Sequence, residues 1–164
     1  MDGDTAKLDA LVGLWRANGA PDRLPSRASF SPEILWPWLG NISLFDVEHP
    51  FRIRIRLHGT GIVEYDGCDY TGRYLDEVLR PELRADVLEH FRRCVRSRQP
   101  VRVDCQGKMG KGIELAVRKV LLPISSDGKQ VDQIISCLYA RFPNRGERWP
   151  GLQEATLALG AGDA

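Results

Sequence analysis

Apolar residues recur at helical spacing near the start of the chain. They are Leu8, Leu11, Val12 and Trp15. This spacing predicts an amphipathic helix of about four turns, capped by Asp4 or Thr5 and ended by Gly19. The apolar side of such a helix has to be buried against another element.

A connector and a short helix are predicted next. Residues 19–27 (GAPDRLPSR) are rich in proline and glycine, which is typical of a connector. Ser31 followed by Pro32 then predicts the first turn of a second helix. This helix is short, because Pro37 interrupts it and Gly40 ends it.

Two strands are predicted over 42–48 and 51–58, joined tightly at Pro50. The second strand alternates, with Phe51, Ile53, Ile55 and Leu57 on one side and Arg52, Arg54 and Arg56 on the other. This pattern fits a half-buried hairpin whose basic face is solvated. It also fits an arginine stripe that binds an anion or a partner, and the sequence leaves both interpretations open.

The second half of the chain combines one long helix with three strands. Residues 59–79 are dense in glycine and contain short helical fragments. A helix is predicted over 81–98, with a buried stripe of Leu83, Val87, Leu88, Phe91, Cys94 and Val95. Strands follow over 101–106, 113–124 and 131–142, the last two joined by a hairpin turn.

This order of elements predicts an α+β fold with a five-stranded antiparallel sheet. In the fourth predicted strand, Val117 and Leu121 lie on one face, whereas Val120 and Leu122 lie on the other. Both faces are therefore covered, one by the later helices and the other by the N-terminal helix. We expect three parts: an N-terminal helix and connector over 1–30, the sheet domain over 31–143, and a C-terminal tail with one weak helix over 144–164.

Composition and charge limit the function classes and the cellular compartment that we expect. With 23 basic and 22 acidic side chains among 164 residues, the chain lacks the overall basic field of a dedicated nucleic-acid binder. No apolar run approaches the roughly 20 residues of a membrane span, and the acidic start is unlike a secretory signal. The four cysteines form no C-x-x-C pair, which indicates free thiols in a reducing compartment. We therefore expect a cytoplasmic protein.

Several motifs, taken in order, resemble a known family. Residues 24–27 (LPSR), 45–47 (FDV), 54–63 (RIRLHGTGIV) and 67–72 (GCDYTG) are similar to the pattern of bacterial stand-alone PAS-like proteins. The resemblance covers about residues 8–142 and implies a PAS fold. It also implies a sensory or regulatory module, not an enzyme, that binds a small ligand between its sheet and its helical segment. Such modules usually act as dimers and signal through protein contacts, here to a separate partner protein.

On this resemblance, six residues fall in the segments that line a PAS pocket. They are Tyr65, Tyr70, Tyr74, Arg118, Cys137 and Tyr139. Binding pockets combine apolar walls with a few polar groups, and tyrosine and arginine suit that role. The same tyrosine hydroxyls also suit bonds to nearby backbone groups in a filled core. The sequence leaves both interpretations open.

Haem and flavin are the cofactors that relatives of such domains carry. A haem-ligating histidine would lie on the long helix, where His90 occurs, but its neighbours Asp86 and Arg93 place it at the edge of the apolar stripe. Light-sensing relatives carry a reactive cysteine in an N-C-R-F-L-Q type motif, and Cys68 departs from that motif at every flanking residue. We therefore favour neither cofactor, leave the ligand unassigned and predict no metal site.

The first helix also bears on assembly. Its apolar residues offer more width than one face of a sheet buries, which predicts a homodimer. The predicted interface consists of Leu8, Leu11, Val12, Leu14 and Trp15. No residue set suggests a catalytic site, so we expect no enzyme. Two alternatives to ligand sensing stay open: a basic-face module that binds nucleic acid, and a ligand-free dimeric adaptor.

Overall fold

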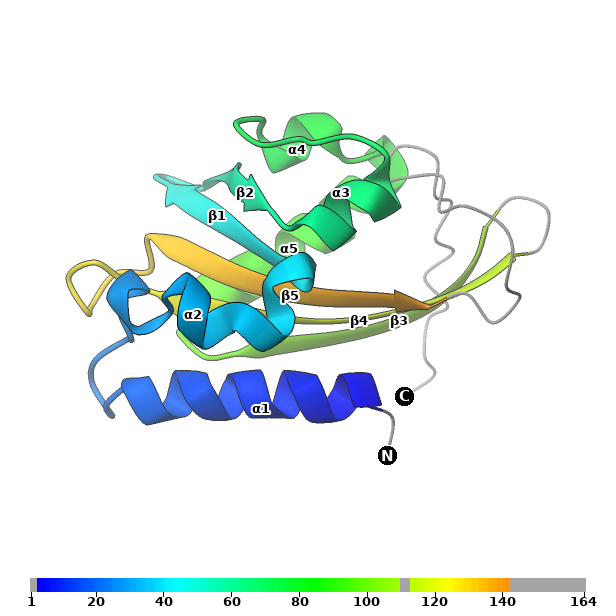
Figure 1. Cartoon of the computed structure of the whole chain (residues 1–164). Helices are drawn as coiled ribbons and strands as arrows, with labels where there is room; N and C mark the ends of the chain where they lie inside the picture. Colours follow the sequence, from blue (N-terminus) through cyan, green and yellow to red (C-terminus); the bar gives the residue numbers. More distant parts are fainter. Residues whose placement is uncertain (1–2, 110–112, 142–164) are drawn as a thin grey trace, which may run out of the picture.

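One antiparallel sheet of five strands organises the part of the chain that the structure describes. The structure is a computed structural model and describes residues 3–109 and 113–141. The strands are β1 (Ile42–Glu48), β2 (Arg52–His58), β3 (Val101–Met109), β4 (Ile113–Ile124) and β5 (Gln133–Arg141), in the order β2-β1-β5-β4-β3. Figure 1 shows β5 between β1 and β4 in the middle of the sheet. The predicted α+β class and antiparallel sheet are confirmed.

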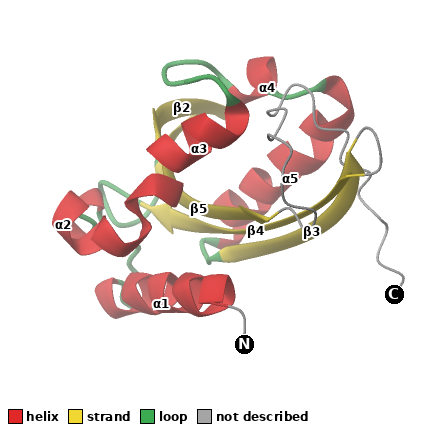
Figure 2. Ribbon diagram, turned by 45° about the vertical axis from the view of Figure 1, so that its right-hand side comes forward, coloured by secondary structure: helices red, strands yellow, loops and turns green. Residues whose placement is uncertain are grey.

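Helices cover both faces of this sheet. One face carries α1 (Gly3–Asn18), α2 (Pro32–Leu35) and the 3-10 segments η1 (Arg27–Ser29) and η2 (Trp36–Asn41), whereas the other carries α3 (Thr60–Asp66), α4 (Leu75–Val78) and α5 (Pro81–Ser97) (Figures 1 and 2). The predicted cover of the second face by the N-terminal helix is therefore confirmed. None of the described helices is both long and apolar enough to cross a bilayer. The weak helix predicted within 144–164 lies outside the described residues.

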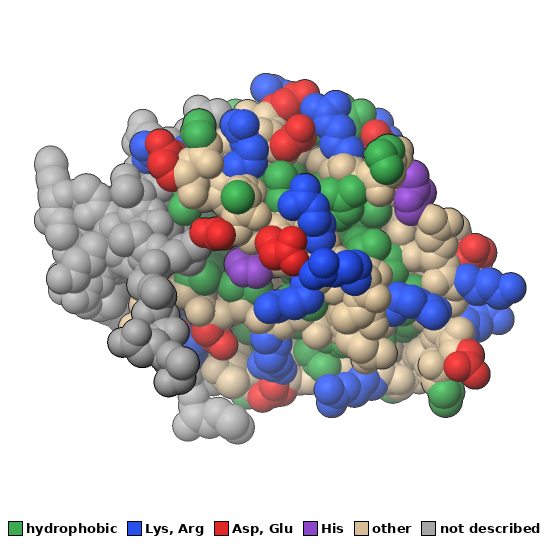
Figure 3. Space-filling model, turned by 180° about the vertical axis from the view of Figure 1, so that it is seen from behind, with side chains coloured by type: hydrophobic (Ala, Val, Ile, Leu, Met, Phe, Trp, Pro, Cys, Tyr) green, Lys and Arg blue, Asp and Glu red, His purple; other side chains and the backbone are tan. Residues whose placement is uncertain are grey.

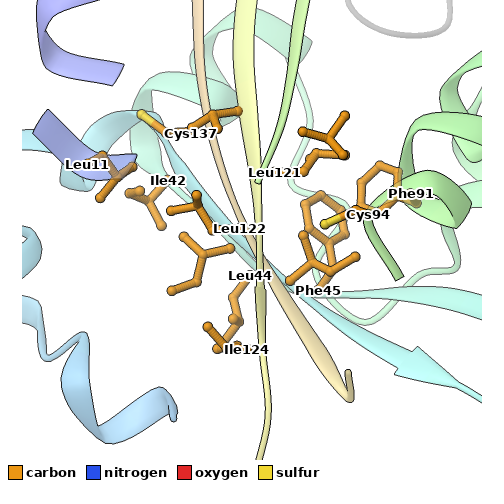
Figure 4. Close-up of a cluster of buried hydrophobic side chains, with 14 of the residues drawn as sticks. Leu11, Ile42, Leu44, Phe45, Phe91, Cys94, Leu121, Leu122, Ile124 and Cys137 are labelled. Carbon is orange, nitrogen blue, oxygen red and sulfur yellow. The ribbon is translucent and has the colours of Figure 1, made fainter. Parts of the chain in front are cut away.

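Buried apolar side chains fill the space between α1 and the sheet. Figure 4 shows Leu11, Ile42, Leu44, Leu122, Ile124 and Cys137 together on one side of the strands, and Phe45, Phe91, Cys94 and Leu121 on the other. The Trp15 indole NH of α1 donates a hydrogen bond to the Pro123 carbonyl of β4, 2.6 Å away. A second indole NH, from Trp38 of η2, donates to the Lys7 carbonyl at 2.9 Å. These two bonds connect α1 to the sheet and to the next helical segment.

The side chains that we predicted at a dimer interface lie inside the chain itself. Leu8, Leu11, Val12 and Trp15 are each at most 6% exposed, and Leu14 is half-buried. One sheet face thus buries the apolar side of α1. The inference that α1 has more apolar surface than this face can bury is not supported by these four residues. Dimerisation stays a prediction, but these side chains no longer support it.

A bulge in β2 changes which side chains face the helices. Leu44 of β1 pairs with Leu57, whereas the next residue, Phe45, pairs with Ile55, so Arg56 is an extra residue in β2. An extra residue reverses the alternation of side chains beyond it. Leu57 is consequently 46% exposed, and the prediction that it shares a face with Ile55 is wrong. His58, one residue further, faces the α3–α5 side.

The turn from β2 into α3 depends on backbone contact at Gly59. The Gly59 amide donates to the Ile42 carbonyl at 2.7 Å. A methyl group at this position would lie 2.7 Å from the carbonyl oxygens of Leu39, Gly40 and Ile42. Such contacts are far inside van der Waals distance, so only glycine allows α3 to start this close to η2 and β1.

Gly59→Ala is expected to destabilise the protein by about 3 kcal/mol, because three backbone oxygens cannot move aside as a flexible side chain can. The matched control is Gly13→Ala in α1, where nothing lies within 4 Å of the added carbon. Alanine there should raise the free energy of unfolding by up to about 1 kcal/mol. Urea denaturation of both variants measures the difference, and equal effects of the two changes would contradict the contact argument.

Trp15→Phe is expected to lower the free energy of unfolding by about 2 kcal/mol. Phenylalanine keeps most of the apolar area but leaves the Pro123 carbonyl without its donor. Trp36→Phe is the control, because Trp36 is 76% exposed and its replacement should change stability by less than about 0.5 kcal/mol. Thermal unfolding followed by circular dichroism compares the two.

Candidate functional site

A cavity of about 130 Å³ lies between the sheet and the helices α3, α4 and α5. Most of its wall is apolar. The polar or charged side chains that reach it come from all five strands and from α3 and α5. These are Ser43, His58, Tyr65, Asp66, Asp86, His90, Cys105, Lys119 and Ser136. An apolar enclosure with a few polar groups is the usual form of a small-molecule site.

Two phenylalanine rings lie between the polar groups of the cavity. The ring of Phe45 meets that of Phe91 edge-to-face at 4.9 Å. On one side, the His58 ring lies 6.3 Å from Phe45. On the other, Lys119 Nζ lies 6.0 Å from the centre of the Phe91 ring. The cavity therefore has an aromatic middle, with His58 near one end and Lys119 near the other.

His58 contributes a buried polar atom without a bond. Its Nδ1 has no hydrogen-bond partner in the described part of the chain. Burial lowers the pKa of His58, and the nearby Asp69 carboxylate opposes that shift only in part. The ring is thus neutral at neutral pH, and its unpaired nitrogen costs stability unless a partner occupies the cavity.

His90 of α5, on the Lys119 side of the cavity, is a second histidine with a buried ring nitrogen. Its Nδ1 is also buried and lacks a partner among the described residues. Burial and the positive charges of Lys119 and Arg93 lower the pKa of His90 to about 4, although Asp86 and Glu89 oppose them. His90 is therefore neutral over the physiological range.

Lys119 of β4 is the cationic group of the site. Burial lowers the pKa of its ammonium group to about 8, and Cys105 on the neighbouring strand partly offsets this effect. Its closest described ring contact is the face of Phe91. A half-buried ammonium group with a perturbed pKa in the wall of a cavity is a candidate for a binding role.

The six predicted pocket residues do not come together. Tyr65 lines the cavity. Tyr70 is buried behind it, with its ring edge-on to His58 at 6.4 Å. Tyr74 lies at the edge of the sheet, where its hydroxyl donates to Glu48 at 3.1 Å and its ring stacks with Arg52 at 3.5 Å.

The other three predicted residues lie on the opposite face of the sheet, under α1. Arg118 donates to the Thr5 hydroxyl at 3.1 Å and pairs with Asp104 at 3.6 Å. Cys137 is buried among the side chains beneath α1 (Figure 4), and this burial raises its pKa to about 12. The ring of Tyr139 carries Lys7 of α1 above it at 5.6 Å. These residues hold α1 in place and do not line the cavity.

His58 and Lys119 were not predicted from the sequence as lining residues, and His90 was considered only as a haem ligand at the edge of the apolar stripe. The signal for Lys119 was present, because it occupies the same strand face as Val117 and Leu121, where a charged side chain breaks an apolar series. His58 carried no comparable signal, since its direction depends on the bulge at Arg56.

The cavity does not fit the cofactors that the sequence brought into question. A porphyrin, or the three fused rings of a flavin, needs several times the space of about 130 Å³. Cys68 is exposed and outside the cavity, so it is not positioned to react with a ring bound there. The exposed thiol and the small volume together argue against a photochemical flavin site.

The arginine stripe of β2 is neutralised by neighbouring acids. Arg52 pairs with Asp76 and Glu77 at 3.3 and 2.7 Å. Arg54 and Arg56 both reach Asp46, at 3.5 and 3.2 Å, and Arg54 also pairs with Glu48 at 3.2 Å. Figure 3 shows basic and acidic side chains interspersed on the face seen from behind. The stripe therefore does not form the unbalanced basic surface that phosphate binding requires.

One of two similar solved structures has a TM-score above 0.5, and it agrees with this fold. A light-oxygen-voltage domain studied with a flavin analogue is 15% identical, with a TM-score of 0.51, over 70% of this chain and 87% of that chain. A LOV protein of Rhodobacter sphaeroides is 11% identical, with a TM-score of 0.47, over 89% of this chain and 70% of that chain. At such identities the likeness concerns the fold alone. No curated protein matches the sequence.

A family comparison is more direct. The family described as "PAS domain" matches residues 4–139, a range that begins in α1 and ends within β5. This match agrees with the sequence motifs and with the five-stranded antiparallel sheet. The chain belongs to the PAS domain family.

Proposed function

We propose that this PAS domain is a sensory or regulatory module that binds a small ligand in the cavity between its sheet and α3–α5. The observation that carries the proposal is the pair of half-buried histidines, His58 and His90, whose buried Nδ1 atoms both lack a partner in the described residues. Leaving a buried polar atom unpaired costs about 1–3 kcal/mol. A ligand that offers two polar groups and an apolar middle would recover that cost.

Signalling through protein contacts fits the surface near α2. Trp36 is 76% exposed and Ile34 is 45% exposed, although both are large apolar side chains. Exposed apolar groups of this size are typical of surfaces that meet another protein. We propose a separate downstream partner, a homodimer and a cytoplasmic setting, and assign no catalytic role to the cavity.

Ligand binding is tested with benzyl alcohol, a neutral probe whose ring matches the size of the cavity. An engineered cavity of about 150 Å³ takes up benzene. We expect saturable binding in ligand-observed NMR and a rise in melting temperature. Val87→Phe should abolish both, because Val87 lines the cavity and the added ring fills it.

Val95→Phe is the matched control. Val95 is another half-buried valine of α5, but it does not line the cavity, so this variant should bind the probe as the parent does. Loss of binding in both variants, or in neither, would contradict a site between α5 and the sheet. Failure of the parent protein to bind the probe would contradict the proposal as a whole.

The neutral state of His90 predicts a particular acid sensitivity. Its folded-state pKa of about 4 lies below the value near 6.5 of an unfolded histidine, so the unfolded chain takes up a proton first as pH falls. Stability from this group is complete above pH 6.5 and is lost between pH 6.5 and 4. Between pH 7.5 and 5, His90→Gln should lose about 1 kcal/mol less unfolding free energy than the parent, allowing for partial exposure.

Urea denaturation at both pH values measures this difference. His49→Gln serves as control, because His49 is an exposed histidine in the β1–β2 turn and does not line the cavity. Identical acid sensitivity of the parent and His90→Gln would show that His90 is not held neutral.

A further inference from the structure

Lys119 indicates which class of ligand the cavity takes. We propose that the cavity binds a small monocarboxylate with a flat apolar body, and that the Lys119 ammonium group contacts the carboxylate. This inference rests on the proposed function and adds the charge and shape of the ligand to it.

The position of Lys119 is set by strands on both sides. β4 pairs with β3 and with β5 here, so that Lys119 lies opposite Val103 on one neighbour and Leu138 on the other. Its side chain points to the α5 face, among Val117, Phe91 and Cys105. Because β4 is paired on both edges, its register is fixed, and Lys119 leaves the sheet on the face that lines the cavity.

The charge of Lys119 is not neutralised by the residues that the structure describes. Arg118, its neighbour on the opposite face, pairs with Asp104, and the arginines of β2 pair with acids as described above. Lys119 has no such ion pair within the described ranges, and its contact is with the Phe91 ring. An ammonium group in a low-dielectric wall gains most from an anion placed beside it.

Two carboxylates also line the cavity, and they would favour a cationic ligand in place of an anionic one. Asp86 is exposed on α5 and acts on His90, whereas Asp66 ends α3. Neither is among the groups that act on Lys119. If these acids governed binding, the cavity would select an amine. Charge therefore separates the two classes, and a series of probes with one ring and different charge decides between them.

The size and middle of the cavity specify the body of the ligand. The volume of about 130 Å³ admits one six-membered ring with a short substituent. The edge-to-face rings of Phe45 and Phe91 offer an aromatic surface on which a flat group packs. Neutral His90, on the same side as Lys119, supplies a further hydrogen-bonding group for a carboxylate oxygen.

The test compares benzoate, benzamide and benzylamine, which share a ring and differ in charge. Titration by NMR or calorimetry at pH 7 should show benzoate binding at least about tenfold more tightly than benzamide, and benzylamine more weakly still. In Lys119→Met, benzoate and benzamide should bind with similar affinity. Lys129→Met, which removes an exposed lysine from the β4–β5 turn, should keep the preference of the parent.

Each other result overturns the inference. Equal binding of benzoate and benzamide, or tightest binding of benzylamine, rejects the carboxylate class but leaves a ligand-binding cavity intact. Binding of benzyl alcohol without any binding of benzoate also rejects the carboxylate class and leaves a ligand-binding cavity. An unchanged preference in Lys119→Met rejects the role of Lys119, provided that its melting temperature shows a folded protein. Benzyl alcohol failing to bind rejects the proposed function itself.

Discussion

The sheet of this protein is buried on both faces, and the rest of the structure depends on how each face is filled. On one face, α1 lies along β4 and packs Leu11 and Trp15 against the strands, with the Trp15 indole bonded to the Pro123 carbonyl. On the other, the short helices α3 and α4 and the long α5 leave the cavity. Because strand side chains alternate, adjacent residues take part in different structures. Arg118 secures α1, and Lys119 faces the cavity.

Two local departures from regular structure complete the site. The bulge at Arg56 reverses the direction of the residues that follow, so His58 faces Phe45 and not solvent. Gly59 then lets the backbone pass against Leu39 and Gly40, which starts α3 directly over the cavity. Both departures occur within four residues of one another, where β2 ends and the helical cover begins. The end of this edge strand therefore sets the geometry of the helices above it.

The elements could be predicted from the sequence because their signals are local. The stripe of α1, the long α5 and the two-residue period of the strands need no knowledge of distant contacts. The site could not be predicted in the same way. Choosing Arg118 over Lys119, or Cys137 over Ser136, is an error of one residue along a strand, and it transfers the side chain to the other face. Since β4 and β5 carry apolar residues on both faces, the pattern alone did not show which face held the cavity.

The polar groups of the cavity contrast with the polar groups elsewhere. Each arginine of β2 forms an ion pair with an acidic side chain. On the α1 side of the sheet, Arg118 forms an ion pair with Asp104. In the cavity, His58, His90 and Lys119 are placed in apolar surroundings without such partners among the described residues. Burying a polar atom without a hydrogen-bond partner costs free energy, and an apolar side chain of similar size avoids that cost. The charged side chains of β2 have ion-pair partners, whereas these three polar groups of the cavity have none among the described residues, and this difference lowers the stability of the free protein. A ligand that binds the folded state at the cavity would restore that stability.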